Sequence, residues 1–437
     1  MKINNNFRNF RHKIKKTYLF RIYFLISVGV IYLLLFLALD KLQYPATTDE
    51  PHYWETSLRF SYSLIPSLEL LGNYGELNTP LPFMMFGGLE YLFQGGIFAG
   101  RFLNLIISFL MTCFIGLPKG KVTKKSVLSV CGLLLFPYYL ILSGRLYTDI
   151  IAAFFVLLGF WFYLRSQHLL SSFAFILAVA SRQFMLAFPF AIAIFELINY
   201  LIIKIRIYGL KDDLKQLANS YSENSEQEQG IIETDYLNIT KTRINSLRWL
   251  MPLIASLSIV GWLLFFQGIA PEAGMAARTV PKVQQNLWSI DLSGCYFALS
   301  SVGLYFVIPE LILFRPKFKI NKLFTRINIF LAAILLLLFI IFPLLEAHGI
   351  LFKAATRLVP NDFLRLALFY FLALITCLRF FTRLNLTFWL LLINCGLMMK
   401  AYPWDKYVLP LLIIFWYLKS RNILDKKSLI KFPSTEI

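Results

Sequence analysis

The chain has 437 residues, of which 58% are hydrophobic and only 15% are charged. A soluble domain is usually about half apolar and about a quarter charged, so this composition excludes an ordinary soluble fold. The formal net charge of +19 would suit a nucleic-acid-binding protein. Here, however, the lysines and arginines lie mostly in short loops between apolar blocks, a pattern typical of membrane topology. We therefore expect no nucleic-acid partner.

Several apolar blocks exceed the roughly 20 residues that a helix needs to cross a bilayer. Backbone amides in lipid must be paired within their own segment, so these blocks predict helices. The expected fold is all-α, a polytopic transmembrane helical bundle. The cysteines lie in or at the edge of apolar segments and are not spaced as metal ligands, which favours neither a disulfide framework nor a metal site. They are Cys113, Cys131, Cys295, Cys377 and Cys395.

The chain begins with a basic segment, residues 1–17, that contains six Lys and Arg and no acid. The positive-inside tendency predicts that this segment is cytoplasmic. A first span at 18–39 leads to an acidic and aromatic stretch, 40–79, which should be external. The loop that starts at Lys119 is basic and should therefore be cytoplasmic. A return from the external stretch to the cytoplasm takes an odd number of crossings, so only one of the next two apolar segments spans the membrane. We expect a helix at the outer membrane surface over 80–96 and the second span over 99–117.

The rest of the chain predicts ten further spans, which makes about twelve with both ends inside. This divides the chain into an N-terminal transmembrane module, 18–203, with an external loop at 40–98, and a C-terminal module, 248–418. A polar cytoplasmic linker, 204–247, joins them, and a cytoplasmic tail covers 419–437. The ten spans are 126–144, 148–164, 169–183, 184–203, 248–267, 291–314, 327–345, 363–379, 386–401 and 407–418.

The strongest chemical signal is the run Thr47-Thr48-Asp49-Glu50-Pro51-His52-Tyr53-Trp54, which follows the first span. Burial of a carboxylate at a membrane surface raises its pKa and suits it to accept a proton from a hydroxyl. Asp49 and Glu50 are therefore candidate general bases. The alternative is a solvated loop whose acids cap a helix that starts near Pro51.

Three other short motifs lie at the ends of predicted spans. Arg145 and Asp149 flank an outer turn, where the alternative is an interfacial anchor together with a helix N-cap by Thr148 or Asp149. The pair Arg182-Gln183 interrupts an apolar stretch, where an ionisable residue is expensive and usually functional, although an arginine that snorkels to the interface is the alternative. The turn 402–407 contains Asp405 and Lys406 between aromatic residues that suit an interfacial belt.

Two external segments contain cations on the side of the membrane that is usually poor in them. Segment 268–290 contains Arg278 and Lys282, and segment 346–362 contains Lys353 and Arg357. Such cations suit a lipid-linked phosphate, with ordinary loop charge as the alternative. The predicted topology brings all these motifs to one external face, which favours a site for a polar substrate at the membrane surface.

The order of these motifs resembles the GT-C superfamily of integral membrane glycosyltransferases. The likeness rests on Asp49-Glu50 after the first span, the Asn-Thr-Pro-Leu-Pro run at 78–82, the Gly-Arg-Phe-Leu-Asn run at 100–104, the Leu-Tyr-Thr-Asp turn at 146–149 and the late segment 404–411. Within the superfamily, the motifs are most similar to the dolichyl-phosphate-glucose-dependent α-1,2-glucosyltransferases and the protein-mannosyltransferase-like families.

The resemblance implies an inverting transfer of a hexose from a polyprenyl-phosphate donor to an acceptor hydroxyl on a glycan, lipid or protein. It implies Asp49 as the general base, with Glu50 as the competing assignment. It implies no resident cofactor, although some relatives use a divalent cation. The residues expected to bind substrate are His52, Tyr53, Trp54, Arg145, Asp149, Arg182, Gln183, Arg278, Lys282, Lys353, Arg357, Asp405 and Lys406.

Two other functions are kept open. A transporter or flippase of lipid-linked sugars would place charged residues in mid-membrane and would contain a repeat; a non-enzymatic polysaccharide-assembly protein would bind with the same external groups but not react. For the leading prediction we expect a multi-pass protein of the bacterial plasma membrane, with the endoplasmic reticulum membrane as the alternative, in contact with membrane lipid.

Overall fold

The protein is all α-helical in the part that the computed structural model describes, residues 2–220, 247–278, 280, 282–285, 288–315, 325–344 and 346–426. Within these ranges the side chains of 2–17, 119, 206–220 and 282 are not described. No β-sheet occurs in the described ranges, where the single β-type pairing joins His348 and Trp404. The prediction of an all-α fold is confirmed for these residues.

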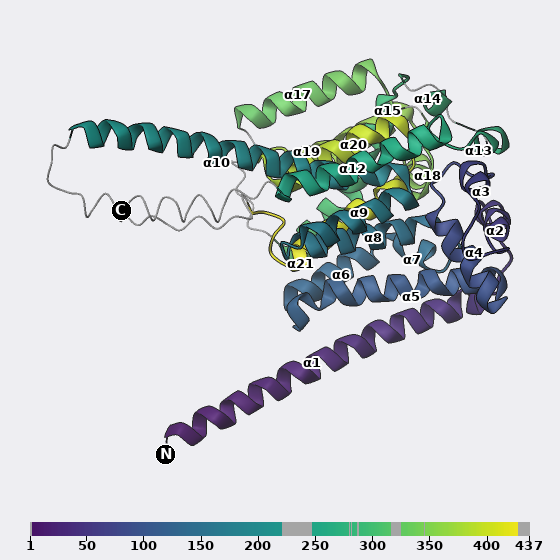
Figure 1. The fold of residues 1–437 in the computed structure, drawn as a ribbon, viewed down its shortest axis with the longest axis horizontal. Coiled ribbons are helices and arrows are strands. Elements are labelled where there is room, and N and C mark those ends of the chain that lie inside the picture. Colours follow the sequence, from purple (N-terminus) through teal and green to yellow (C-terminus); the bar gives the residue numbers. More distant parts are fainter. Residues whose placement is uncertain are drawn as a thin grey trace.

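The first half of the bundle starts with a long helix, α1, whose first residues diverge from the other helices (Figure 1). Shorter helices follow it, before α5 runs back along the bundle. The elements are α1 (Lys2–Ala38), α2 (Glu50–Arg59), α3 (Leu68–Gly72), α4 (Leu81–Phe93), α5 (Gly96–Gly116), α6 (Lys124–Leu134), α7 (Pro137–Ser143), α8 (Thr148–Tyr163), α9 (His168–Ser181), the 3-10 turn η3 (Gln183–Leu186) and α10 (Ala187–Ser220).

The second half again alternates long apolar helices with short ones. Its elements are α12 (Leu247–Phe266), α13 (Glu272–Ala277), α14 (Lys282–Gln285), α15 (Leu292–Val302), the π-helical η4 (Gly303–Val307), α16 (Ile308–Phe314), α17 (Arg326–Ile341), α18 (Ile350–Leu358), α19 (Asp362–Phe380), α20 (Leu386–Leu397), η6 (Met398–Lys400), η7 (Asp405–Val408) and α21 (Leu409–Ser420).

Six described helices are long and apolar enough to cross a membrane, or seven if α6 and α7, bent by 76°, form one span. The chain is therefore a multi-pass membrane protein. The predicted twelve spans exceed this number, since α8, α9, α17, α20 and α21 contain only 12 to 16 residues. Each would cover about 18–24 Å, less than the roughly 30 Å hydrocarbon core.

These apolar runs yield shorter helices because the backbone leaves the helical conformation inside them. Arg182 is extended, with φ −156° and ψ 130°, and ends α9 within the predicted span 169–183. Phe136 is also extended, and it precedes Pro137, which disfavours a helical conformation at the residue before it. The helix expected over 80–96 corresponds to α4, whose 13 residues are too few to span.

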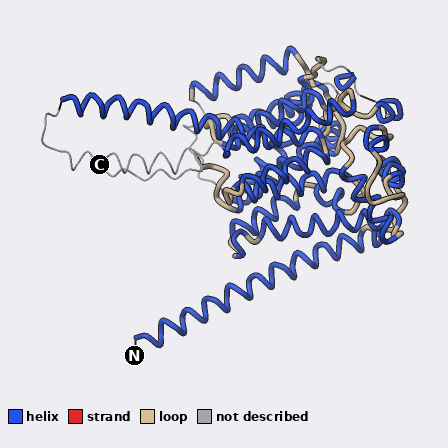
Figure 2. Tube along the Cα trace, in the orientation of Figure 1, coloured by secondary structure: helices blue, strands red, loops and turns tan. Residues whose placement is uncertain are grey.

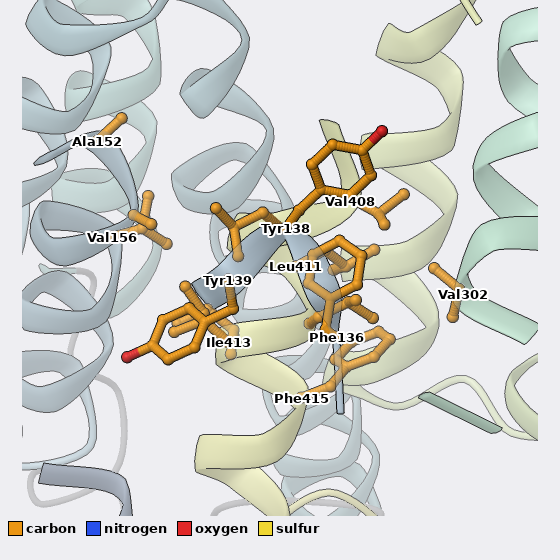
Figure 3. Packing of buried hydrophobic residues seen from close by; sticks show 14 of the residues in the cluster. Phe136, Tyr138, Tyr139, Ala152, Val156, Val302, Val408, Leu411, Ile413 and Phe415 are labelled. Atoms are coloured by element: carbon orange, nitrogen blue, oxygen red, sulfur yellow. The ribbon is translucent and has the colours of Figure 1, made fainter. Parts of the chain in front are cut away.

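The centre of the bundle is filled by α21, in which every residue from Leu409 to Leu418 is buried. A helix that is apolar on all sides belongs in an interior, and α6 and α8 pack directly against this one. Figure 3 shows Leu411 and Phe415 of α21 among side chains from neighbouring helices. Gly132 of α6 allows this close approach, because a β-carbon there would overlap the Trp416 indole.

Short helices gather at one end of the bundle, which we call the site end. It contains α2, α3, α13, α14 and α18, on the opposite side from the N-terminal end of α1 and the C-terminal end of α10 (Figure 1). In Figure 2 the loops that join these short helices lie at the same end. Motifs from both halves of the chain therefore meet there.

Candidate functional site

A buried ion pair anchors the loop that follows α1. The Arg101 guanidinium binds both carboxylate oxygens of Glu50 at 2.9 Å, and both side chains are fully buried. Arg101 also donates to the carbonyl oxygens of Leu42 and Tyr44 at 2.9 and 2.7 Å, while Glu50 accepts from two backbone amides. All of these contacts hold the loop, and Glu50 does not line the cavity at the site end.

Asp49 has the opposite environment, although it is the adjacent residue. Thr48 before it adopts a left-handed conformation, with φ +56°, and Asp49 remains 26% exposed. Its oxygens lie 2.9 Å from Arg278 Nη2 and 3.6 Å from Lys406 Nζ. Burial alone would raise the pKa of Asp49, but the Lys406 and Arg278 charges outweigh burial and hold this pKa below its usual range. Asp49 is therefore an ionised carboxylate between two cations.

A cavity of about 740 Å³ lies at the site end next to Asp49. Residues from α2, η3, α13 and η7 contribute to its wall, so it joins both halves of the chain. Seven of the predicted site residues line it: Asp49, His52, Tyr53, Arg182, Gln183, Arg278 and Lys406. Its volume falls in the range of small-molecule sites, which makes it the candidate functional site.

Arg182 is held at the cavity wall by an ion pair with a second buried carboxylate. Asp149, at the start of α8, forms an ion pair with Arg182, and both side chains are almost fully buried. The guanidinium carbon of Arg182 also lies 4.8 Å from the Phe184 ring centre and 5.6 Å from that of Tyr407. Asp149 itself does not line the cavity, so its position supports a structural role behind Arg182.

The turn between α20 and α21 directs two consecutive charged residues in different directions. Lys406 lines the cavity, with its ammonium 3.6 Å from the Trp404 ring centre. Asp405 is buried away from the cavity and accepts from the Leu351 amide at 2.7 Å and the Tyr305 hydroxyl at 3.0 Å. Asp405 thereby holds α18 against this turn.

Several other predicted residues lie outside the cavity. Trp54 packs against the apolar core, and the Arg145 guanidinium donates to the Thr48 hydroxyl at 3.4 Å without lining the cavity. Lys353 and Arg357 are exposed on α18 and do not line the cavity. The side chain of Lys282 lies outside the described part of the structure.

The sequence reasoning missed Glu76 and Asn78, which line the cavity from the loop between α3 and α4. Glu76 is only 2% exposed, and its Oε2 lies 3.5 Å from Arg278 Nε. Burial raises the pKa of Glu76 to about 7, although the Arg278 charge opposes the rise. The available signal was an acid two residues before the Asn-Thr-Pro run at 78–82, close to the other acidic motif.

The cavity combines carboxylates with a surplus of positive charge. Arg182, Arg278, Lys400 and Lys406 line it beside Asp49 and Glu76. Such a set can bind a phosphate group and place a carboxylate beside it, as proton transfer from a hydroxyl requires. Among the described residues, no group of three or more His, Cys, Asp or Glu side chains is placed to hold a metal ion.

Comparison of the chain with protein-family models, with curated proteins and with solved structures finds no match. The assignment of a function therefore rests on the sequence motifs and on the geometry of the cavity.

Proposed function

We propose that the protein is a glycosyltransferase that moves a hexose from a polyprenyl-phosphate donor to an acceptor hydroxyl at the external membrane face. The main support is the cavity of about 740 Å³ at the site end, where Asp49 lies between Arg278 and Lys406. A lipid-phosphate donor needs both an anion site and an apolar body that keeps its tail in the membrane. The long apolar helices supply the second requirement.

In the proposed reaction Asp49 accepts the proton of the acceptor hydroxyl. The acceptor oxygen attacks the anomeric carbon from the face opposite the phosphate, so a new C–O bond forms with inversion. The bond between the anomeric carbon and the phosphate oxygen breaks, and polyprenyl phosphate leaves with the electron pair. Arg182, Arg278 and Lys406 stabilise the negative charge that develops on the leaving group.

The same cations couple donor binding to the basicity of Asp49. Without donor, Lys406 and Arg278 hold the pKa of Asp49 low, which makes it a weak base. A donor phosphate that binds these cations neutralises part of their charge, and the pKa of Asp49 then rises towards its usual value. The base therefore becomes effective when the leaving group is in place. Glu50 does not line the cavity, because Arg101 holds its carboxylate inside the protein.

The test is transfer of radiolabelled hexose from a polyprenyl-phosphate hexose by purified protein in detergent. We expect Asp49→Asn to lower the rate about a hundredfold or more, which corresponds to about 2.7 kcal/mol of barrier. Glu55→Gln is the matched control, because Glu55 lies on α2 as an exposed partner of Arg59, and it should retain full activity. Wild-type protein that binds the donor but releases no sugar to any acceptor or to water would contradict the proposal.

A further inference from the structure

Two arginines lie at the end of the bundle opposite the cavity, which we call the far end. Helix α21 begins just after Lys406, which lines the cavity, and α8 begins beside Asp149. Both helices finish at the far end, where Arg165 and Arg421 follow them. The 12 residues of α21 place Arg421 about 18 Å from the cavity end of that helix. These arginines are therefore separate from the candidate functional site.

The acids described at the far end already bind other cations. They are Glu196, Glu310 and Asp425, which pair with Arg248, Arg379 and Lys419. In the part of the chain that the structure describes, Arg165 and Arg421 belong to none of the ion pairs. Burial lowers the pKa of Arg421, and the nearby positive charge of Arg165 also acts to lower it. The two guanidinium groups therefore repel each other without a compensating anion.

Aromatic rings hold the two guanidinium groups in place. The guanidinium carbon of Arg165 lies 4.0 Å from the Trp161 ring centre, and that of Arg421 lies 4.6 Å from the Tyr417 ring centre. The Phe114 ring connects these rings, with its centre 5.6 Å from each of theirs. An arginine that stacks on a ring keeps the N–H donors at its edge available. Both arginines can therefore bind an anion without losing the aromatic contacts.

Lys125 of α6 adds a third cation to this cluster. Its ammonium donates to the side-chain oxygen of Asn422, the residue after Arg421, at 2.7 Å. An ammonium has three N–H donors, so two remain for a ligand. Lys125 and Arg165 are exposed and Arg421 is half-buried. A ligand can therefore approach the cluster from the protein surface.

The depth of Arg165 in the membrane indicates where the anion comes from. Leu169 and Leu170, about one helical turn further along the chain, are 70% and 49% exposed. In a multi-pass protein such exposed apolar side chains suit lipid tails, which places Arg165 at the boundary between the hydrocarbon and the headgroups. The phosphate of a phospholipid lies at this boundary, and basic clusters there bind anionic headgroups. Guanidinium groups also match phosphate oxygens in geometry.

We propose that Arg165, Arg421 and Lys125 bind a phosphate group at the far end of the bundle. The headgroup of an acidic phospholipid is the source that this depth favours, and free phosphate is the other source. The site does not depend on glycosyl transfer and can be tested without it.

The experiment titrates the full-length protein in a non-ionic detergent with phosphatidylglycerol, with a diacylglycerol of the same chain length, or with inorganic phosphate. The rise in melting temperature gives an apparent Kd for each. Wild-type protein should show saturable stabilisation by phosphatidylglycerol and none by the diacylglycerol, which lacks the phosphate. Arg165→Gln/Arg421→Gln should raise the Kd for phosphatidylglycerol about tenfold, because charge-assisted hydrogen bonds to the phosphate are lost.

Lys121→Gln/Lys124→Gln is the matched control, because it removes the same charge from exposed positions at the far end. It should leave the Kd for phosphatidylglycerol unchanged. If the double arginine variant unfolds, Arg165→Gln alone changes only an exposed side chain and should raise this Kd by a smaller factor. Inorganic phosphate that stabilises wild type and displaces phosphatidylglycerol at a similar Kd would support the site and make its ligand soluble. An unchanged Kd in the arginine variants, or an equal increase in the control, would overturn the proposal.

Discussion

Adjacent residues in this protein take opposite roles, because side-chain direction depends on the local backbone. Asp49 lies beside the cavity, whereas Glu50 is fully buried against Arg101. Lys406 lines the same cavity, whereas Asp405 is buried against the backbone of α18. The sequence predicted Asp49 and Glu50 as competing general bases and Asp405 and Lys406 as substrate-binding residues, and it did not show that the members of each pair face in different directions. The left-handed turn at Thr48 and the contacts of distant helices decide them.

Glu50 provides a prediction about stability. Glu50→Gln leaves the buried Arg101 charge without its partner, which should lower the free energy of unfolding by about 3–5 kcal/mol. Replacement of both residues by leucine should restore part of this loss, because no unpaired charge remains. Thermal unfolding in detergent, followed by tryptophan fluorescence, measures both variants. A Glu50→Gln protein with unchanged stability and lost activity would instead make Glu50 a catalytic candidate.

Glu76 provides a prediction about pH. Because the folded-state pKa of Glu76 is about 7 and its ordinary value is 4.5, the folded state binds the extra proton between these values. The contribution of Glu76 to stability is therefore most favourable at low pH and is lost as the pH rises through about 7. Arg278, Asp49 and Arg182 are the charged groups that act on Glu76. Glu76→Gln should raise the melting temperature relative to wild type at about pH 8 and not at about pH 5. A shift of equal size at both pH values would contradict the raised pKa.

At the scale of elements, the contact between α18 and the turn before α21 depends on one glycine. Gly349 has φ +106°, a conformation that other residues rarely adopt, and a β-carbon there would overlap the Asp405 carboxylate. Asp405 in turn accepts a hydrogen bond from Leu351 in the first turn of α18. Asp405, which the sequence predicts as a substrate-binding residue, therefore sets the position of α18.

Gly349→Ala should release α18 from this turn. We expect faster hydrogen–deuterium exchange over residues 350–358 and a lower melting temperature, because both backbone strain and overlap disfavour the contact. Gly396→Ala is the matched control, since no atom lies within 4 Å of a β-carbon at that position. Equal exchange over α18 in the two variants would show that the Asp405 contact does not hold the helix.

At the scale of the whole molecule, the sequence predicted the helical bundle and the location of its helices well. Each predicted span overlaps a helix in the structure, because long apolar runs in lipid have few alternatives to a helix. The number of full spans was wrong, because breaks at residues such as Arg182 and Phe136 shorten the helices within these runs. The cavity lining could be predicted only in part, because Glu76 and Arg278 are about 200 residues apart in the sequence and are neighbours only in the folded bundle.

The sidedness of the bundle is a prediction that labelling can test. In a background without the five native cysteines, Ser63→Cys places a thiol on an exposed loop between α2 and α3 at the site end. Gln167→Cys places one in the exposed turn between α8 and α9, at the far end of α8 from the site. A membrane-impermeant maleimide should label Ser63→Cys in intact cells and Gln167→Cys only after permeabilisation. The reverse result would place the site end inside.

The central position of α21 has a consequence for the order of assembly. Residues 409–418 leave the ribosome after all the helices that surround them, so the centre of the bundle is filled only late in synthesis. Until then, the faces of α6 and α8 that α21 later covers must be occupied by lipid or by provisional helix contacts. Gly132 has no indole to contact at that stage. The contacts of α21 with α6 and α8 can therefore form only after residues 409–418 have been synthesised.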